Sequence, residues 1–300
     1  MKAAILIDST AYVSDKIKRK SYIYPVYLSV SFSDGTVIVD RSDVEETKAF
    51  YDKMLISKDL PKSSQPSVLD VSNAYEKIIA DGYDTVFAIG ISKVLSGTFS
   101  TMYSVGQQYA DQLDIHYINS KIVTIPEGII AQYVIQMIEN GYDAPTIVTA
   151  ITEVIDNVKT WFSVDDLTNL IKGGRLNSTV GVIGSALKVK PVIAFDDEGD
   201  IGLKEIIRGQ KKVYKKFGEY ITQHAESKDN GDFTLAVIGG DNQEGIDKML
   251  EVLSDTIKNH QIDVQTGEIG PVIATHTGKG ALGIIIVPKP VVDGKVISAL

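Results

Sequence analysis

Short apolar runs alternate with longer amphipathic segments through the first half of the chain, and this alternation constrains the fold more than any other feature. The apolar runs are rich in Val, Ile and Tyr and predict strands over 3–8, 22–32, 85–92 and 115–120. Helices are predicted over 44–55, 71–82, 97–110, 127–139 and 145–157. This order is typical of a parallel sheet covered by helices on both faces, which binds ligands at the carboxyl ends of its strands.

Two of the predicted helices begin with a polar pair at capping-box spacing. Ser42 with Glu45 precedes the first helix, and Ser67 with Asp70 precedes the second. In such a pair the hydroxyl accepts a hydrogen bond from a backbone N–H that the first helical turn leaves unpaired. Both serines are therefore predicted to cap their helices.

The pattern changes after about residue 158. A short strand over 161–164 leads through a helix to a glycine-rich turn at 172–175, and acidic and glycine residues between 192–195 and 203–207 predict a hairpin. Further elements are a Lys-rich helix from 210, a strand over 233–240, a helix over 244–258, and strands near 264–269 and 283–287. We expect a second α/β domain with a mixed sheet over 158–290, after a first domain over 1–157, with the ligand between them.

Composition excludes several classes of protein. The 300 residues contain 30 basic and 39 acidic side chains, and the resulting charge of -9 argues against nucleic-acid binding. The absence of Cys excludes disulfides, thiolate metal sites and a cysteine nucleophile. The chain has no signal-peptide pattern and no apolar run of membrane-spanning length, so a cytoplasmic protein is expected. No metal or cofactor is expected either, because H-E-x-x-H, G-x-G-x-x-G and Walker patterns are missing.

The turn at Ser96, Gly97 and Thr98 joins a predicted strand to a helix and is a candidate anion site. Unpaired N–H groups and the helix dipole favour a carboxylate or phosphate there, Gly97 lets a ligand oxygen approach, and two hydroxyls add donors. The alternative is that Ser96 only caps its helix.

Four other polar segments are candidates for binding. Asp8–Thr10 either contacts a ligand or caps the next turn, and the loop over 62–67 is either solvated or a binding edge. In the third segment, 172–175, Arg175 follows a glycine that ends a helix, and its side chain is either solvated or clamps an anion. The fourth segment, 270–280, is predicted to be a loop between strands and contains His276, the strongest candidate of the four His residues.

Ser96 and His276 together suggest a serine hydrolase of small acyl esters as an alternative function. The sequence around Ser96 is V-L-S-G-T rather than the G-x-S-x-G nucleophile elbow. No acidic residue is identifiable as the partner that would orient His276. Spacing alone leaves this alternative open.

Six motifs occur in order along the chain: Ile7-Asp8-Ser9-Thr10, Ser64-Gln65-Pro66-Ser67, Leu95-Ser96-Gly97-Thr98, Gly173-Gly174-Arg175, Leu187-Lys188-Val189-Lys190-Pro191, and Gly270-Pro271-Val272 followed by His276. With these motifs the chain resembles the DegV family of bacterial fatty-acid-binding proteins. The resemblance covers nearly the whole chain. It implies two α/β domains with one long-chain fatty acid in an apolar tunnel between them.

The resemblance also implies the roles of residues and partners. Hydroxyls at Ser63 and Ser96 would hold the carboxylate, with Arg175 and His276 nearby; position 63 is Ser where the family usually has Thr. The chain would perform no chemistry and need no cofactor. It would present its acid to a separate ATP-binding fatty acid kinase subunit, supply phospholipid synthesis, and make transient contact with a membrane surface.

Two further interpretations remain open beside this one. The same loops would suit another anionic amphiphile. In addition, Arg208 with Gln210, Lys211 and Lys212 forms a basic strand-to-helix junction that is either a solvated face or a contact surface for an acidic or phosphate-bearing partner.

Overall fold

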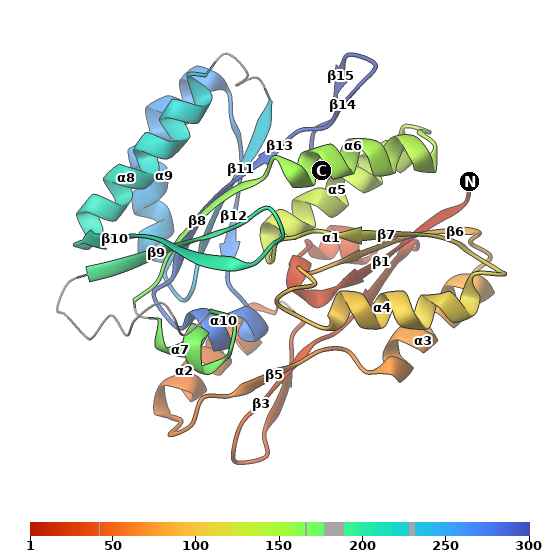
Figure 1. Ribbon diagram of the computed structural model, residues 1–300, viewed down its shortest axis with the longest axis horizontal. Coiled ribbons are helices and arrows are strands. Elements are labelled where there is room, and N and C mark those ends of the chain that lie inside the picture. Colours follow the sequence, from red (N-terminus) through yellow and green to blue (C-terminus); the bar gives the residue numbers. More distant parts are fainter. Residues whose placement is uncertain (42, 166, 177–188, 228–231) are drawn as a thin grey trace.

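The computed structural model describes residues 1–41, 43–165, 167–176, 189–227 and 232–300. It contains two large sheets that lie side by side, each covered by helices (Figure 1). The first, sheet A, has the strand order β2-β1-β6-β7 and is parallel throughout. Its strands are β1 (Ala3–Asp8), β2 (Ile23–Val26), β6 (Thr85–Gly90) and β7 (Asp114–Asn119). The predicted α/β class with a parallel first sheet is confirmed.

Alternate residues of β1 enter different cores because successive side chains of a strand point to opposite faces. Ala4 and Leu6 pack with helices α3 (Val68–Ala80) and α4 (Thr98–Gly106), whereas Ile5 and Ile7 pack with α5 (Ile125–Glu139) and α6 (Ala144–Asp156). Burial on both faces explains the continuous apolar run of this strand.

The second sheet, sheet C, is mixed, with the order β10-β9-β8-β13-β11-β12. Its strands are β8 (Lys159–Ser163), β9 (Val189–Phe195), β10 (Ile201–Arg208), β11 (Phe233–Gly239), β12 (Asp263–Glu268) and β13 (Leu282–Pro288). Among the strand pairs that the structure describes in this sheet, β11 and β12 are parallel and the others antiparallel, and β9 and β10 form the predicted antiparallel hairpin. Helices α8 (Gln210–Ala225) and α9 (Gln243–His260) pack on one face.

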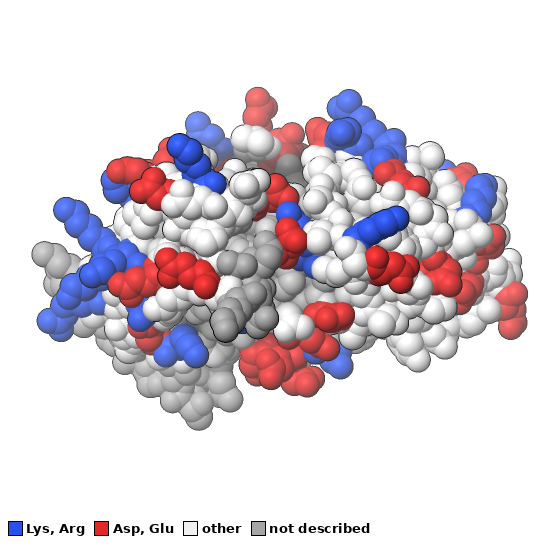
Figure 2. Space-filling view, turned by 90° about the horizontal axis from the view of Figure 1, so that it is seen from above, with Lys and Arg blue, Asp and Glu red and all other residues white. Residues whose placement is uncertain are grey.

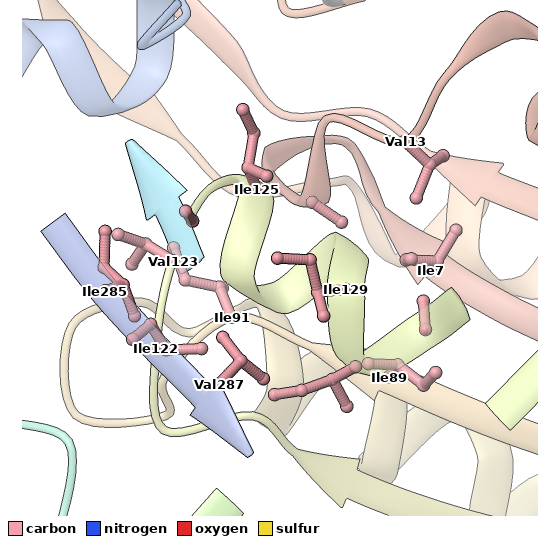
Figure 3. Packing of buried hydrophobic residues seen from close by; sticks show 14 of the residues in the cluster. Ile7, Val13, Ile89, Ile91, Ile122, Val123, Ile125, Ile129, Ile285 and Val287 are labelled. Atoms are coloured by element: carbon pink, nitrogen blue, oxygen red, sulfur yellow. The ribbon is translucent and has the colours of Figure 1, made fainter. Parts of the chain in front are cut away.

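Helix α5 connects the cores of the two sheets. Figure 3 shows its residue Ile129 among buried side chains of both, with Ile7 and Ile89 from sheet A and Ile285 and Val287 from sheet C. These side chains belong to one continuous apolar cluster. Because the same helix packs against both sheets, their relative position is fixed by tightly packed apolar contacts.

Small elements complete the region where the sheets meet. A three-stranded sheet, order β4-β3-β5, is formed by β3 (Ser29–Ser31), β4 (Val37–Val39) and β5 (Lys62–Ser64). Helices α2 (Val44–Ile56), α7 (Thr168–Lys172) and α10 (Pro271–Thr277) lie beside it. The rest are α1 (Asp15–Lys18), 3-10 turns at Ser9–Ala11 and Gln107–Tyr109, and strands β14 (Val291–Val292) and β15 (Lys295–Val296). Among the described helices, none has the length and apolar character needed to span a bilayer.

Two predicted elements are wrong. The run 22–32 is not one strand: the chain leaves sheet A after β2, Leu28 N–H donates to Ser9 Oγ (3.0 Å), and β3 pairs in the small sheet. The segment 270–280 is not a continuous loop, because it contains α10, which begins at Pro271, where the missing N–H of proline costs no hydrogen bond.

The two predicted helix caps have different outcomes. Ser67 caps α3 as predicted and accepts from Asp70 N–H at 3.0 Å. Ser42 lies outside the described residues, and the cap of α2 is Asp43, whose carboxylate accepts from Glu46 N–H at 2.9 Å. The carboxylate one position later fulfils the same role as the predicted hydroxyl.

Candidate ligand-binding cavity

A cavity of about 300 Å³ lies where the carboxyl ends of β1 and β6 face sheet C. Its apolar lining is drawn from both halves of the chain: Leu28, Ile91, Leu95, Val123, Phe162, Leu170, Ile193, Phe195, Ile201, Val272 and Ile273. Its polar lining consists of Ser63, Ser64, Gln65, Ser96, Gly97, Arg175, His276 and Thr277. A mostly apolar wall with a few polar groups is typical of sites for small amphiphilic ligands.

The polar wall centres on a hydrogen bond between two residues far apart in the sequence. Ser63 Oγ on β5 lies 2.8 Å from His276 Nε2 on α10. The contact is possible because α10 packs directly against β5 and α7. Either atom can donate, depending on the tautomer of the imidazole.

Two glycines allow side chains of this wall to approach the backbone closely. A Cβ on Gly173 would overlap His276 Nδ1, and one on Gly97 would overlap Gln65 Oε1. Gln65 also donates from Nε2 to Thr101 Oγ1 on α4 at 2.6 Å. Glycine is required at Gly173, where a Cβ would also lie 2.8 Å from the backbone oxygen of Asn169. At Gly97 a Cβ would displace the flexible end of the Gln65 side chain.

Arg175 is held against the cavity by two backbone carbonyls. Its Nε donates to Leu95 O at 3.1 Å and its Nη1 to Gly173 O at 2.7 Å. The guanidinium is partly buried rather than solvated, and its fork has five N–H donors, so groups beyond these two bonds remain to face a ligand. A partly buried guanidinium with free donors suits an anion.

Burial and the positive charge of Arg175 lower the pKa of His276 from its usual value near 6.5 to about 4. The imidazole is therefore neutral at physiological pH. In the described part of the chain, its Nδ1 is buried and has no hydrogen-bond partner. A bound anion would favour the protonated form and raise this pKa.

The turn before α4 is built differently from the simple cap considered for Ser96. Gly97 is the residue that precedes the helix, while Ser96 Oγ accepts from Thr98 N–H (3.2 Å) and contacts Thr98 Oγ1 (2.9 Å). Thr98 is fully buried and does not line the cavity. Ser96 itself lines the cavity and retains lone pairs and a hydroxyl proton that can turn toward a ligand.

A second cavity, of about 620 Å³, lies on the other side of the polar wall. The two cavities share Ser63, Arg175 and His276. The second one is also lined by Lys58, Lys62 and Lys172, which are exposed, and by a single acidic residue, Asp59. The three shared residues therefore lie between a mostly apolar cavity and one with a basic lining, and we call the latter the outer cavity.

The structure brings together most of the residues that the sequence singled out. One cavity is lined by Ser63, Ser96, Gly97, Arg175 and His276. Thr98 does not line this cavity, but its hydroxyl contacts that of Ser96. Sequence reasoning did not select Gln65, whose side chain lies against Gly97. It also could not find the apolar lining, because these side chains are scattered over both halves of the chain.

The hydrogen bonds do not form the pair that a Ser96 hydrolase requires. Within the described residues, His276 Nε2 contacts Ser63 and Ser96 contacts Thr98. A Ser63–His276 pair lacks the third group of a triad, because Nδ1 of His276 has no acceptor there to orient it. Nor does the described part contain a cluster of three or more His, Cys, Asp or Glu residues suited to a metal ion.

Two candidates from the sequence lie away from the cavity. Asp8 and Thr10 are buried and bonded to each other (Oδ1 to Oγ1, 2.6 Å) and do not line it. The basic junction at Arg208, Lys211 and Lys212 is exposed at the start of α8. Figure 2 shows Lys and Arg side chains gathered at the end of the molecule where α8 lies, on the left of the view.

Comparison with known proteins gives consistent results. The family model described as "Uncharacterised protein, DegV family" matches residues 2–289. A DegV domain-containing protein of Staphylococcus aureus is 32% identical over 284 residues, which are 95% of this chain and 96% of that protein. A DegV domain-containing protein of Streptococcus pyogenes is 30% identical over 96% of this chain and 100% of its own.

Solved structures share the architecture as well. The fatty acid binding DegV family protein of Streptococcus agalactiae superimposes with a TM-score of 0.87 at 28% identity, over 96% of this chain and 99% of that one. DegV from Bacillus subtilis, described as a fatty acid binding protein, has a TM-score of 0.79 at 30% identity, over 96% and 100%. A Thermotoga maritima protein described as revealing fatty acid binding function has a TM-score of 0.81 at 27% identity, over 96% and 99%.

Proposed function

The chain belongs to the DegV family, and from that premise we propose that it binds one long-chain fatty acid in the cavity between its two sheets. The observation that carries the proposal is the asymmetry of this cavity. Its wall is mostly apolar, and its polar lining includes Ser63, Ser96, Arg175 and His276. Relatives of the same fold are described as fatty-acid-binding proteins.

The chemistry of a fatty acid fits this asymmetry. Each methylene group that leaves water for the apolar wall contributes about 0.8 kcal/mol, so the tail supplies affinity. The carboxylate needs donors to offset the cost of losing water, and two hydroxyls, an imidazole and a guanidinium are at hand. The head group therefore sets orientation, with the carboxylate against the wall that borders the outer cavity.

We further propose that the protein carries its ligand and performs no chemistry. The carboxylate would be presented through the outer cavity to a separate fatty acid kinase, which forms the acyl phosphate for phospholipid synthesis in the cytoplasm. The basic lining of the outer cavity supports this direction, because Lys58, Lys62 and Lys172 attract phosphate. On this view the boundary near residue 157 separates two domains that enclose the acid.

The first experiment identifies what the protein retains. Native mass spectrometry of the protein purified from bacteria, followed by denaturing extraction, is expected to release about one long-chain fatty acid per chain. The double variant Ser96→Ala, His276→Ala should lose it, whereas Ile206→Ala, an exposed position on β10 away from the cavity, should retain it. An empty wild-type protein that also takes up no added fatty acid would contradict the proposal.

A second experiment separates carrier from enzyme. The protein should show no turnover of short acyl esters, and Ser63→Ala and Ser96→Ala should change retention of the acid rather than any hydrolytic rate. Turnover that disappears in either serine variant would instead identify a nucleophile.

We also propose that the basic junction at the start of α8 is a contact surface for the kinase, in addition to the opening at the outer cavity. Reversal of charge at Arg208 and Lys211 should slow phosphorylation of the bound acid by the kinase while leaving retention of the acid intact. An unchanged rate of phosphorylation would remove the junction from the proposal.

A further inference from the structure

Phe195 lies at a border of the ligand cavity that is separate from the polar wall. It lines the main cavity together with Ile193 and Ile201, and it also lines a small cavity of about 40 Å³ beyond it. Among the residues described, Phe195 is the one that these two cavities share. The outer cavity shares Ser63, Arg175 and His276 with the main cavity and shares nothing with the small one. The main cavity is therefore bounded by the polar wall on one side and by Phe195 on another.

The ring of Phe195 is fixed by its neighbours. It packs against Phe162 with ring centres 5.7 Å apart, and its N–H donates to Thr160 Oγ1 at 2.9 Å. Across the hairpin it is directly opposite Ile201. The ring is therefore held by a strand partner and an adjacent aromatic side chain.

The hairpin that carries Phe195 is anchored to the other half of the chain. Ser92 Oγ donates to Gly199 O at the hairpin tip, at 2.7 Å. Gly199 has a φ of +84°, and a Cβ there would lie 2.7 Å from Ser92 Oγ and 2.8 Å from Lys121 O. Because glycine permits this close approach, the hairpin tip packs against the loops that follow the strands of sheet A. This contact holds the strand that carries Phe195 beside the cavity.

The space behind Phe195 is small and partly charged. The small cavity is lined by Ile122, Ile155 and Val158, but also by Asp156, Asp196, Asp197 and Lys121, and Lys121 Nζ is paired with Asp156 at 2.9 Å. Methylene groups gain free energy by leaving water for apolar surroundings, and charged groups do not provide these. A tail that reached past the ring would therefore displace a fixed aromatic side chain and enter a small, partly charged pocket.

From this geometry we infer that Phe195 is the end wall for the acyl tail and sets the longest chain that the protein binds well. The inference rests on the proposed fatty-acid function and adds to it a residue that determines chain-length specificity. Removal of the ring should open space at the end of the tail, and a larger ring should close it.

The test is competition between fatty acids of different length. Ligand-free protein is mixed with equal amounts of saturated straight-chain acids from lauric to behenic acid, and the bound acids are extracted and identified by mass spectrometry. Phe195→Ala should shift the distribution toward longer acids, by about fourfold for each methylene group that the new space accepts, which corresponds to about 0.8 kcal/mol. Phe195→Trp should shift it toward shorter acids, and Ile206→Ala, on the exposed face of the same hairpin, should leave it unchanged.

The outcomes distinguish this inference from the proposed function. A wild-type protein that binds none of the acids overturns both. Variants that bind one acid per chain with the wild-type distribution overturn the role of Phe195 alone. If Phe195→Ala does not fold, Phe195→Leu and Phe195→Trp decide the question: opposite shifts in length support the inference, and identical distributions overturn it.

Discussion

Two polar clusters in this molecule differ in what surrounds them. Ser63, Arg175 and His276 border a cavity, and Nδ1 of His276 has no partner in the described part of the chain. Asp8 and Glu127 lie in the core between β1 and α5, with exposed fractions of 2% and 0%, and do not line that cavity. The first cluster carries donors and a positive charge, whereas the second consists of carboxyl groups.

The acidic cluster satisfies most of its own hydrogen bonds. Asp8 accepts from Thr10 N–H (2.9 Å), from Thr10 Oγ1 (2.6 Å) and from Ile91 N–H (2.7 Å). Thr10 Oγ1 also lies 3.1 Å from Glu127 Oε2. Because a hydroxyl has one hydrogen, Thr10 cannot donate to both carboxylates at once, so one of the two carboxyl groups holds a proton. Burial raises the pKa of Asp8 as well, but that of Glu127 is raised further. Burial, followed by the nearby charge of Asp8, raises the pKa of Glu127 well above its usual value, in agreement with a neutral carboxyl.

This contrast separates a structural cluster from a binding one. Asp8 joins the ends of β1 and β6 through its bond to Ile91, and its acceptors are used within the fold. The groups at the cavity keep unused donors and a charge that no described carboxylate neutralises. Substitutions in the core cluster should therefore change the free energy of unfolding, and substitutions at the cavity should change binding.

The largest expected effect is on stability, from Asp8→Ala. This change leaves the N–H groups of Thr10 and Ile91 without their acceptor in the core, which should lower the free energy of unfolding by about 4 kcal/mol. Urea denaturation measures the loss. Asp43→Ala, which removes one exposed cap of α2, is the control and should cost about 1 kcal/mol. Equal losses of unfolding free energy in the two variants would show that the buried hydrogen bonds of Asp8 contribute no more to stability than an exposed helix cap.

The second prediction concerns the pH dependence that His276 gives the ligand-free protein. Its pKa is about 4 in the folded state and near 6.5 when unfolded, so between these values the unfolded chain binds the additional proton. Stability should fall as pH drops through this window, by up to about 3 kcal/mol. His276→Asn should remove this part of the acid sensitivity. Identical slopes of unfolding free energy against pH in both proteins would contradict the buried, neutral imidazole.

A smaller effect, on binding alone, is expected from Ser63→Ala. Loss of one hydrogen bond to a charged head group should weaken fatty-acid binding about tenfold, because such bonds contribute about 1.5 kcal/mol or more. Ser63→Thr keeps the hydroxyl and should restore affinity. Ser31→Ala, on neighbouring β3, is the matched control. Fluorescent fatty-acid displacement measures all three, and equal affinities of Ser63→Ala and Ser31→Ala would remove Ser63 from the site.

Local signals in the sequence predicted the fold well because they act over a few residues. The Ser67 cap and the acidic turn between β9 and β10 each depend on neighbours in the chain, and both are present. Helix α10 was missed because its seven residues lie between glycines and are mostly apolar; the proline at its start was the available signal.

The candidate site could be predicted only in part, because its residues are far apart in the sequence. Ser63 and His276 are 213 positions apart, and no spacing rule brings them together. The resemblance to a known family placed Ser63, Ser96, Arg175 and His276 near one carboxylate without pairing Ser63 with His276. The residues alone suggested Ser96 with His276. The end wall at Phe195 depends on how a hairpin tip seats against Ser92, a contact between the two halves that leaves no local pattern.

The smallest predicted effect comes from a comparison of two carboxyl groups on helix α5, the buried Glu127 and Glu139 at the end of the helix. The pKa of Glu127 is raised in the folded protein, whereas in the unfolded chain it has its ordinary value of about 4.5. Above that value the folded protein keeps a proton that the unfolded chain has released, so the stability contributed by this group falls as pH rises. Glu127→Gln cannot ionise and should be more stable than the wild type at neutral pH, by about 1 kcal/mol, with the difference vanishing in acid. Glu139 has the opposite sign, because its hydrogen bond to Lys20 lowers its pKa, so Glu139→Gln should lose stability at neutral pH. Denaturation of both variants across pH tests the assignment, and a Glu127→Gln protein less stable than the wild type at neutral pH would show that the buried carboxyl is ionised.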